Sequence, residues 1–163
     1  MYRPSFTEQF LDIAEVVSRR ATCPRRSVGA VITKDNIIIS TGYNGSEPGS
    51  SHCLDVGCLM VDNHCKRTIH AEDNAIRNCS NKEGLIDSKV YIYGGGPCLS
   101  CSYWLIENGL KEIHCFSHDG KYINEDWNRY NFKLLMEKGV SSFVHMNVPS
   151  GGGYVLVEQY IGD

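Results

Sequence analysis

The chain has 163 residues, of which 42% are hydrophobic and 21% charged, and its formal net charge is −3 at pH 7. These values fit one soluble globular domain with a single core. No run approaches the roughly 20 apolar residues of a membrane helix, and the first residues lack a signal peptide's apolar core, so we expect a cytoplasmic protein without membrane partners. The 19 acidic residues outnumber the 16 Lys and Arg residues, which argues against a polynucleotide partner, because binding one depends on neutralising its phosphates.

The first part of the chain predicts a helix and then a hairpin. Ser5 and Glu8 form a capping-box pattern, and apolar residues then recur at helical spacing to about Arg20. Residues 27–33 and 37–41 are apolar, β-branched runs separated by a turn-forming Lys-Asp-Asn, which predicts two paired strands. The segment that follows, 42–68, is rich in Gly, Ser, Cys and His and has no period, and loops of this length are usually functional.

From residue 69 onward, strands and helices are expected to alternate. Helices are predicted over residues 70–79, 98–108 and 127–138. Strands are predicted over residues 90–93, 113–116, 142–145 and 154–157. The alternation predicts a mostly parallel sheet covered by helices, in a single α/β domain over residues 1–163. Residues 149–163 form a C-terminal extension, which we expect to be either an edge strand or a subunit contact.

Two short motifs carry the chemistry of the chain. His70 is followed two residues later by Glu72, and Pro97 precedes the pair Cys98 and Cys101. A catalytic zinc ion has three protein ligands and keeps one position open for water. We therefore expect His70, Cys98 and Cys101 to bind a catalytic zinc ion, with Glu72 left off the metal to transfer protons.

Each motif by itself is also found in proteins of other kinds. A Cys-x-x-Cys pair occurs as a redox pair or as half of a structural zinc site, and His-x-Glu occurs by chance. Together, in this order and at two predicted helix starts, the motifs favour a catalytic zinc. A non-catalytic zinc-binding or regulatory protein and a redox protein are the alternatives from other functional classes.

Further cysteines could bind a second metal ion. Eight cysteines are many for a chain of this size, and in a reducing compartment such thiols bind metal or stay free. A structural zinc with four protein ligands would order the 42–68 segment, and free thiols in a mobile loop are the alternative. We favour four cysteines as ligands, with His52 or His64 as substitutes for one of them: Cys23, Cys53, Cys58 and Cys65.

The chain resembles the deoxycytidylate deaminase branch of the cytidine-deaminase-like family over about residues 5–145. The order H-x-E followed by P-C-x-x-C is typical of zinc deaminases. The other matching segments are 22–32 (TCPRRSVGAVI), 41–46 (TGYNGS), 67–72 (RTIHAE), 74–76 (NAI) and 108–113 (NGLKEI). The resemblance implies a three-layer α/β/α fold with a central mixed sheet of about five strands.

The resemblance also implies a function. It implies a zinc-dependent hydrolase that converts dCMP to dUMP and ammonia and so feeds thymidylate synthesis. A second, structural zinc, a homo-oligomer, most often a hexamer, and the effectors dCTP and dTTP also belong to relatives of this branch.

By position, the resemblance assigns residues that contact the nucleotide. Tyr43, Asn44 and Gly45 would belong to the substrate site, where Asn44 would hydrogen-bond the sugar or orient the nucleotide. Ala71 would lie under the base. A plain turn asparagine is the alternative for Asn44. Four cations near the motifs could meet the phosphate, and the sequence does not choose among them: Arg25, Arg26, Lys66 and Arg67.

Two positions depart from the family pattern. Gly94–Gly96 stand where a Thr-His-aromatic triplet is usual, and Asp73 stands where an apolar residue is usual. Three glycines would either widen the pocket, for example for a 5-substituted cytosine nucleotide, or only shape a loop. Free cytidine, guanine, tRNA and nucleoside triphosphates are the other substrates of related deaminases.

Overall fold

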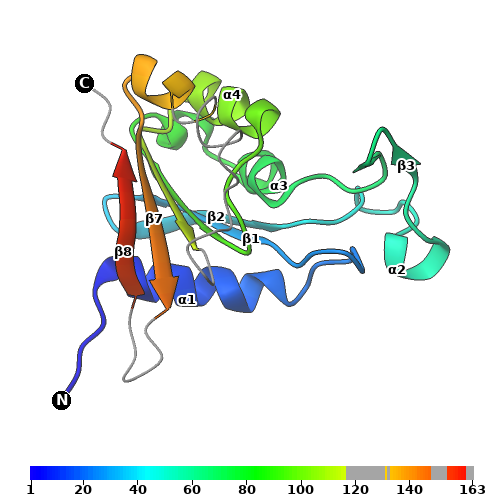
Figure 1. Cartoon of the computed structure of the whole chain (residues 1–163), viewed down its shortest axis with the longest axis horizontal. Helices are drawn as coiled ribbons and strands as arrows, with labels where there is room; N and C mark the ends of the chain where they lie inside the picture. Colours follow the sequence, from blue (N-terminus) through cyan, green and yellow to red (C-terminus); the bar gives the residue numbers. More distant parts are fainter. Residues whose placement is uncertain (117–130, 132, 148–153, 161–163) are drawn as a thin grey trace.

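A six-stranded sheet in the order β2-β1-β5-β6-β7-β8 forms the centre of the computed structural model, which describes residues 1–116, 131, 133–147 and 154–160 (Figure 1). Its strands are β1 (Gly29–Lys34), β2 (Ile37–Tyr43), β5 (Lys89–Tyr93), β6 (Glu112–Phe116), β7 (Ser141–Asn147) and β8 (Tyr154–Tyr160). Only β5, β6 and β7 run parallel to one another, and every other neighbouring pair is antiparallel. The sheet is therefore mixed, as the family resemblance implied. The mostly parallel sheet expected from the alternation of elements was wrong, because hairpins extend both edges.

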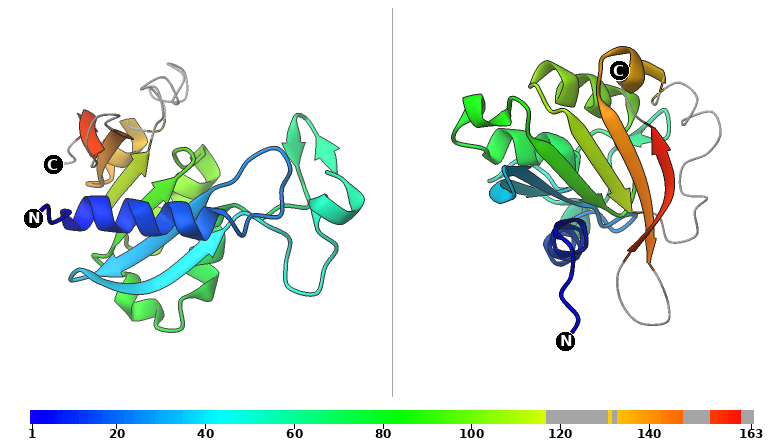
Figure 2. Two further views of the ribbon diagram at one scale, coloured as in Figure 1. Left: turned by 90° about the horizontal axis from the view of Figure 1, so that it is seen from below. Right: turned by 90° about the vertical axis from the view of Figure 1, so that its left-hand side faces the viewer.

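Helices cover both faces of the sheet, which gives three layers (Figures 1 and 2). On one face, α1 (Phe6–Ser18) packs Phe10 and Leu11 against a cluster that includes Tyr91 of β5. On the other face, α3 (Ala71–Asn78) and α4 (Leu99–Glu107) pack over a larger apolar cluster that includes Ile92 and Ile113. The three-layer α/β/α architecture predicted from the resemblance is confirmed.

Two glycines allow the helices to approach the sheet closely. A Cβ at Gly29 of β1 would lie 2.0 Å from the backbone oxygen of Ala14 in α1. A Cβ at Gly42 of β2 would lie 2.3 Å from the backbone nitrogen of Ala75 in α3. Backbone atoms cannot move aside as a flexible side chain can, so both positions need glycine for the observed packing.

The start of α1 and the β1–β2 turn follow the sequence signals closely. The N–H of Glu8 donates to Ser5 Oγ, and the N–H of Ser5 donates to the Glu8 carboxylate, which is the predicted capping box. Asp35 and Asn36 have positive φ values of 52° and 61°, as a tight hairpin turn requires. These local predictions are confirmed.

Residues 46–68, which we call the arm, project from the body of the protein between β2 and α3 (Figures 1 and 2). The arm holds the short helix α2 (Cys53–Val56) and the two-residue strands β3 (Met60–Val61) and β4 (His64–Cys65), which pair antiparallel. Gly45 and Ile69 exchange two backbone hydrogen bonds at its base, of 3.1 and 2.9 Å. This bridge fixes the chain where it enters α3.

The C-terminal extension contributes β8, the sixth strand, which pairs with β7. The phenol of Tyr154 donates to the carboxylate of Asp12 in α1 at 2.6 Å, so the extension also contacts the N-terminal helix.

Of the helix predicted over 127–138, residues 131 and 133–137 are helical, and its start lies outside the described residues. Lys82–Leu85 form a 3-10 helix, η1. Within the described part of the chain, no helix is long and apolar enough to cross a membrane.

Candidate metal centre and its cavity

The structure brings His70, Cys98 and Cys101 together at the starts of two helices. His70 is the N-cap residue of α3, and Cys98 is the N-cap residue of α4. Their ligand atoms and Cys101 Sγ all lie within 4.8 Å of one another. His70 Nδ1 is 3.3 Å from Cys101 Sγ and 3.5 Å from Cys98 Sγ. These three residues therefore form a compact group with the geometry of a metal site.

Hydrogen bonds within the group favour a thiolate at Cys98. The Cys101 side chain, followed by His70, holds the charged form of Cys98 and lowers its pKa to about 4. The same interaction raises the pKa of Cys101, and Cys98 raises the pKa of His70. In addition, the Cys101 N–H donates to Cys98 Sγ at 3.5 Å, and the N-terminal end of a helix favours negative charge.

Glu72 lies beside this group and is not part of it. It is in the first turn of α3, and its side chain is almost entirely buried, with 4% exposure. Burial disfavours the charged carboxylate and raises the pKa of Glu72 to about 7. A carboxyl group with this pKa can both accept and donate a proton near neutral pH.

The donor set fits zinc. One imidazole and two thiols are the ligands that zinc takes in tetrahedral sites, and three protein ligands leave a fourth position open. Hard cations such as Mg²⁺ and Ca²⁺ prefer oxygen ligands instead. The residues present therefore suit a zinc ion with one position free for chemistry.

A cavity of about 300 Å³ borders the group. Glu72, His70 and Cys98 line it together with Asn44 and Ala71, two of the predicted nucleotide contacts. Four arm residues also line it: Asn63, His64, Cys65 and Thr68. The volume is within the usual range for small-molecule sites. A second cavity, of about 660 Å³, also borders His70 and Cys98 and reaches Trp104 of α4.

Tyr43 and Gly45, the other two predicted contacts, are not among the residues that line the 300 Å³ cavity. The carbonyl of Tyr43 accepts a hydrogen bond from Asn74 at 2.9 Å, which joins β2 to α3. A Cβ at Gly45 would lie 2.8 Å from Thr22 Oγ1, so this glycine permits close packing beside the cavity. Neither residue is thus part of the cavity lining in this structure.

Asn44 holds the backbone of the facing segment. Its Oδ1 accepts from the N–H of Val28 at 2.8 Å, and its Nδ2 donates to the carbonyl of Arg26 at 2.9 Å. Asn44 is only 6% exposed, although it borders the cavity. In this structure the amide therefore fixes residues 26–28, which form one wall.

A second group of thiols lies in the arm. Sulfur atoms of Cys53, Cys58 and Cys65 are mutually within 4.8 Å, and Cys53 Sγ is 3.5 Å from Cys65 Sγ. Burial opposes ionisation of Cys65, but hydrogen bonds led by that of Thr68 lower its pKa to about 6. Cys23, the fourth ligand that we favoured, is outside this group and lines the cavity instead.

The two histidines considered as substitutes occupy different places. His52 Nδ1 is 3.0 Å from Thr22 Oγ1, and His52 is not among the residues of the thiol group. His64 borders both cavities. Thr68, whose Oγ1 is 3.2 Å from Cys53 Sγ, was missed at the level of sequence, because a threonine carries no spacing signal for contact with a thiol.

Residues 4–117 match the family model of the cytidine and deoxycytidylate deaminase zinc-binding region. With the three-layer fold and the His-Cys-Cys group, this match shows that the chain belongs to the cytidine and deoxycytidylate deaminase family.

Several individual proteins of known name are similar to this chain in sequence. ComE operon protein 2 of Bacillus subtilis is 46% identical over 144 residues, which cover 86% of this chain and 71% of that protein. The deoxycytidylate deaminase of Mycobacterium phage D29 is 33% identical over 124 residues, covering 69% of this chain and 95% of that protein. By contrast, the chain spans only 37% and 45% of two longer yeast deoxycytidylate deaminases.

Among solved structures, the dCMP deaminase of cyanophage S-TIM5, in complex with dCMP and dUMP, is similar to this chain with a TM-score of 0.69. The two share 25% sequence identity, and the match covers 88% of this chain and 99% of the phage protein.

Proposed function

We propose that this protein is a zinc-dependent deaminase that converts dCMP and water to dUMP and ammonia. The observation that carries the proposal is the burial of Glu72 in the same cavity as His70 and Cys98, in a chain of this family. Support for dCMP as the substrate comes from the relatives named deoxycytidylate deaminase and from the phage enzyme bound to dCMP and dUMP.

In this proposal His70, Cys98 and Cys101 hold the zinc ion. Zinc supplies a Lewis acid that makes water a better nucleophile at neutral pH. Glu72 takes a proton from the attacking water and delivers it to the cytosine ring nitrogen, N3. It then transfers the second proton of the water to the departing amino group, which leaves as ammonia while the ring becomes uracil. The pKa of about 7 suits Glu72 to this repeated transfer.

Ala71 and the glycines at 95 and 96 are small residues that border the same cavity. Small side chains leave room for a flat pyrimidine ring next to Glu72. The same room favours one alternative substrate, a cytosine nucleotide with a substituent at C5, because such a group needs space that a bulky triplet would fill.

An ammonia-release assay tests the proposal. The substrates are dCMP, CMP, dCTP, deoxycytidine and 5-hydroxymethyl-dCMP, each with zinc-loaded protein. We expect the highest kcat/KM with dCMP, loss of activity after chelation, and recovery on adding zinc. A clear preference for 5-hydroxymethyl-dCMP would select the alternative, and no ammonia from any of the five would refute the deaminase proposal.

We also propose that the arm binds a second, structural zinc through Cys53, Cys58 and Cys65. Support comes from the closeness of the three sulfurs and from the exposure of the arm's large apolar side chains, which therefore form no core that could order it. A fourth ligand completes the tetrahedral set, and Cys23 and His64, both next to the cavity that Cys65 lines, are the nearest choices from the sequence.

Assembly, effectors and location follow from the resemblance and from thiol chemistry. We propose a homo-oligomer, with a hexamer favoured, that responds to dCTP and dTTP. Light scattering and assays with each triphosphate test these two points. We propose a cytoplasmic location because none of the eight cysteines is in a disulfide, as is usual in a reducing compartment.

A further inference from the structure

We propose that Arg26 binds the 5′-phosphate of the nucleotide and makes the cavity selective for nucleoside monophosphates over nucleosides. The inference rests on the proposed deaminase function, and it assigns a role that the sequence left open among several cations.

The structure separates the candidate cations by position. Arg25 and Arg26 border the 300 Å³ cavity, whereas Lys66 borders the second cavity. Arg67 donates from Nε to the carbonyl of Gly57 at 3.2 Å, within the arm. Arg25 directs Nη1 to Met60 Sδ at 3.0 Å, also in the arm. Arg26, by contrast, borders the cavity and directs its guanidinium to the body of the protein, as the hydrogen bond to Gly94 shows.

The backbone of Arg26 is held in place by hydrogen bonds from Asn44. Asn44 donates to the Arg26 carbonyl, accepts from the Val28 N–H, and donates its own N–H to the Val28 carbonyl at 3.3 Å. These hydrogen bonds tie residues 26–28 to the end of β2, and Asn44 itself is almost fully buried. A residue fixed in this way loses little further entropy when it binds a ligand.

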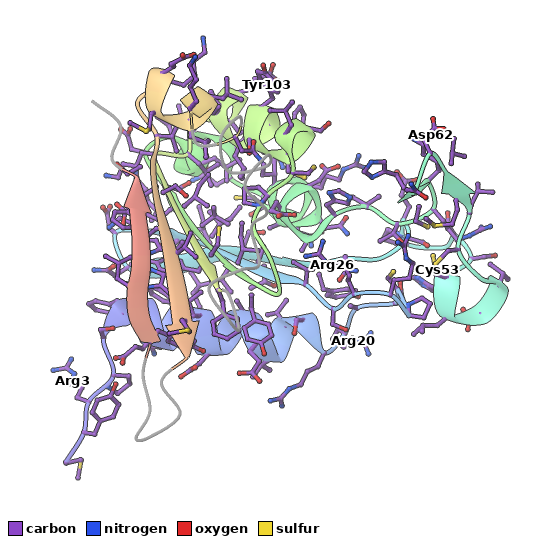
Figure 3. All side chains as sticks on the ribbon, in the orientation of Figure 1. Arg3, Arg20, Arg26, Cys53, Asp62 and Tyr103 are labelled. Atoms are coloured by element: carbon purple, nitrogen blue, oxygen red, sulfur yellow. The ribbon has the colours of Figure 1, made fainter. Side chains whose placement is uncertain are left out.

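The guanidinium of Arg26 is hydrogen-bonded to the segment that follows β5. Its Nη2 donates to the carbonyl of Gly94 at 2.9 Å. Gly94 has a φ of 99°, and a Cβ there would lie 2.4 Å from the carbonyl oxygen of Ser27, so the backbones at Gly94 and Ser27 pack directly against each other. Figure 3 shows Arg26 between the body of the protein and the arm that carries Cys53. Its charged group therefore has a defined direction beside the cavity.

The charges of the cavity match a nucleotide laid across it. Glu72 is buried, whereas Arg26 is exposed to solvent. Arg26, His70 and Glu72 all line the same 300 Å³ cavity, so a ligand in this cavity can contact both the arginine and the reacting end. A guanidinium presents a planar fork of donors that matches phosphate oxygens, and such charge-assisted bonds are the stronger kind. The base can then lie at Glu72 while the phosphate meets Arg26.

The test compares dCMP with deoxycytidine in the variant Arg26→Gln. We expect kcat/KM for dCMP to fall about 10- to 100-fold, as for loss of a charged hydrogen bond, while that for deoxycytidine changes less than about twofold. Arg26→Lys keeps the charge but loses the fork, so it should fall between wild type and Arg26→Gln. Arg67→Gln, which removes an arginine from the arm, is the matched control and should not change the ratio of the two substrates.

Binding of the products gives a second readout that needs no turnover. By calorimetry, Arg26→Gln should weaken dUMP binding by a similar factor and leave deoxyuridine binding unchanged. Equal losses of kcat/KM with dCMP and deoxycytidine would show that Arg26 only supports the segment at Gly94. An unchanged ratio of kcat/KM for dCMP to that for deoxycytidine in every variant would show that Arg26 does not bind phosphate. Either result overturns the proposal. A wild-type enzyme that deaminates deoxycytidine as well as dCMP would also overturn it while leaving deamination intact. If the wild type releases no ammonia at all, the deaminase proposal fails, and the comparison of dUMP with deoxyuridine still decides the role of Arg26.

Discussion

The backbone N–H of Cys101 donates to the sulfur of Cys98, its neighbour one helical turn earlier. Cys98, the first of the two cysteines that we propose as zinc ligands, is thereby also the cap of α4. This explains why the Cys-x-x-Cys pair stands at a helix start: the spacing that places both sulfurs on one face also satisfies an N–H that the helix leaves without a partner. The start of α4 and the part of the His-Cys-Cys group that Cys98 and Cys101 supply are therefore one local structure.

Replacing Glu72 should separate catalysis from metal binding. Glu72→Gln keeps the size of the side chain but cannot accept a proton, so we expect ammonia release from dCMP to fall by about 10²- to 10⁴-fold, the usual contribution of a general acid–base. Zinc content, measured by atomic absorption, should stay at the wild-type value. Asp73→Asn is the control, since the neighbouring carboxylate instead pairs with Arg77 at 2.9 Å. Loss of zinc from Glu72→Gln would show that the carboxylate is a ligand.

The arm thiols should account for one zinc ion per chain. Cys58→Ser should remove that ion and leave the other, because it takes one sulfur from the group of three. We expect KM for dCMP to rise more than kcat falls, since His64, Cys65 and Thr68 of the arm border the cavity. Zinc per chain and steady-state kinetics measure both effects.

A matched variant then decides the fourth ligand. Cys23→Ser should keep the arm zinc if Cys23 is only a cavity residue, and should lose it if the predicted set of four cysteines is right. A single zinc ion per wild-type chain, with Cys53, Cys58 and Cys65 all open to alkylation in the native state, would rule out the second site.

Adding one methyl group at Gly42 should destabilise the fold. In Gly42→Ala the new Cβ meets backbone atoms of α3 at 2.3 Å and 2.5 Å, so strand and helix must move apart. Overpacking of this kind costs about 1–3 kcal/mol, which lowers Tm by several degrees. Gly84→Ala is the control, because its nearest contact is the side chain of Asn81 at 3.2 Å. Equal Tm values for the two variants in thermal melts would argue against the close helix–sheet contact.

Acid should destabilise the protein through His145. This residue is 7% exposed, and its Nε2 is 2.8 Å from Nδ1 of His114 on the neighbouring strand. Burial, with a smaller contribution from His114, lowers the pKa of His145 to about 4. In the unfolded chain, His145 becomes protonated near pH 6.5, whereas in the folded chain it becomes protonated only near pH 4. The contribution of neutral His145 to the free energy of unfolding is therefore fully present above pH 6.5. It is lost as the pH falls from 6.5 to about 4.

Thermal melts from pH 7 to pH 4.5 measure this effect. His145→Gln cannot titrate, so its Tm should fall less steeply with acid than that of the wild type. Parallel slopes for wild type and His145→Gln would contradict the prediction.

Local signals predicted much of this molecule well. The Ser5–Glu8 capping box, the turn at Asp35 and Asn36 and the motif residues at the starts of α3 and α4 all follow from neighbours in the chain. Such features depend on backbone groups within a few residues, so their spacing is enough to predict them. Grouping His70 with Cys98 and Cys101 needed the added knowledge that zinc takes these ligands together.

The sequence by itself therefore determined the residue types of the metal group, the acid beside it and the helix starts that carry them, because these are set by short-range spacing. Only the tertiary structure decided that Cys23 stands apart from the arm thiols, that Arg26 and not Lys66 or Arg67 borders the 300 Å³ cavity, and that Asn44 holds its wall. These relationships join segments far apart in the chain. Their positions depend on how the sheet, α3 and the arm pack together, and no local pattern of residues encodes that packing.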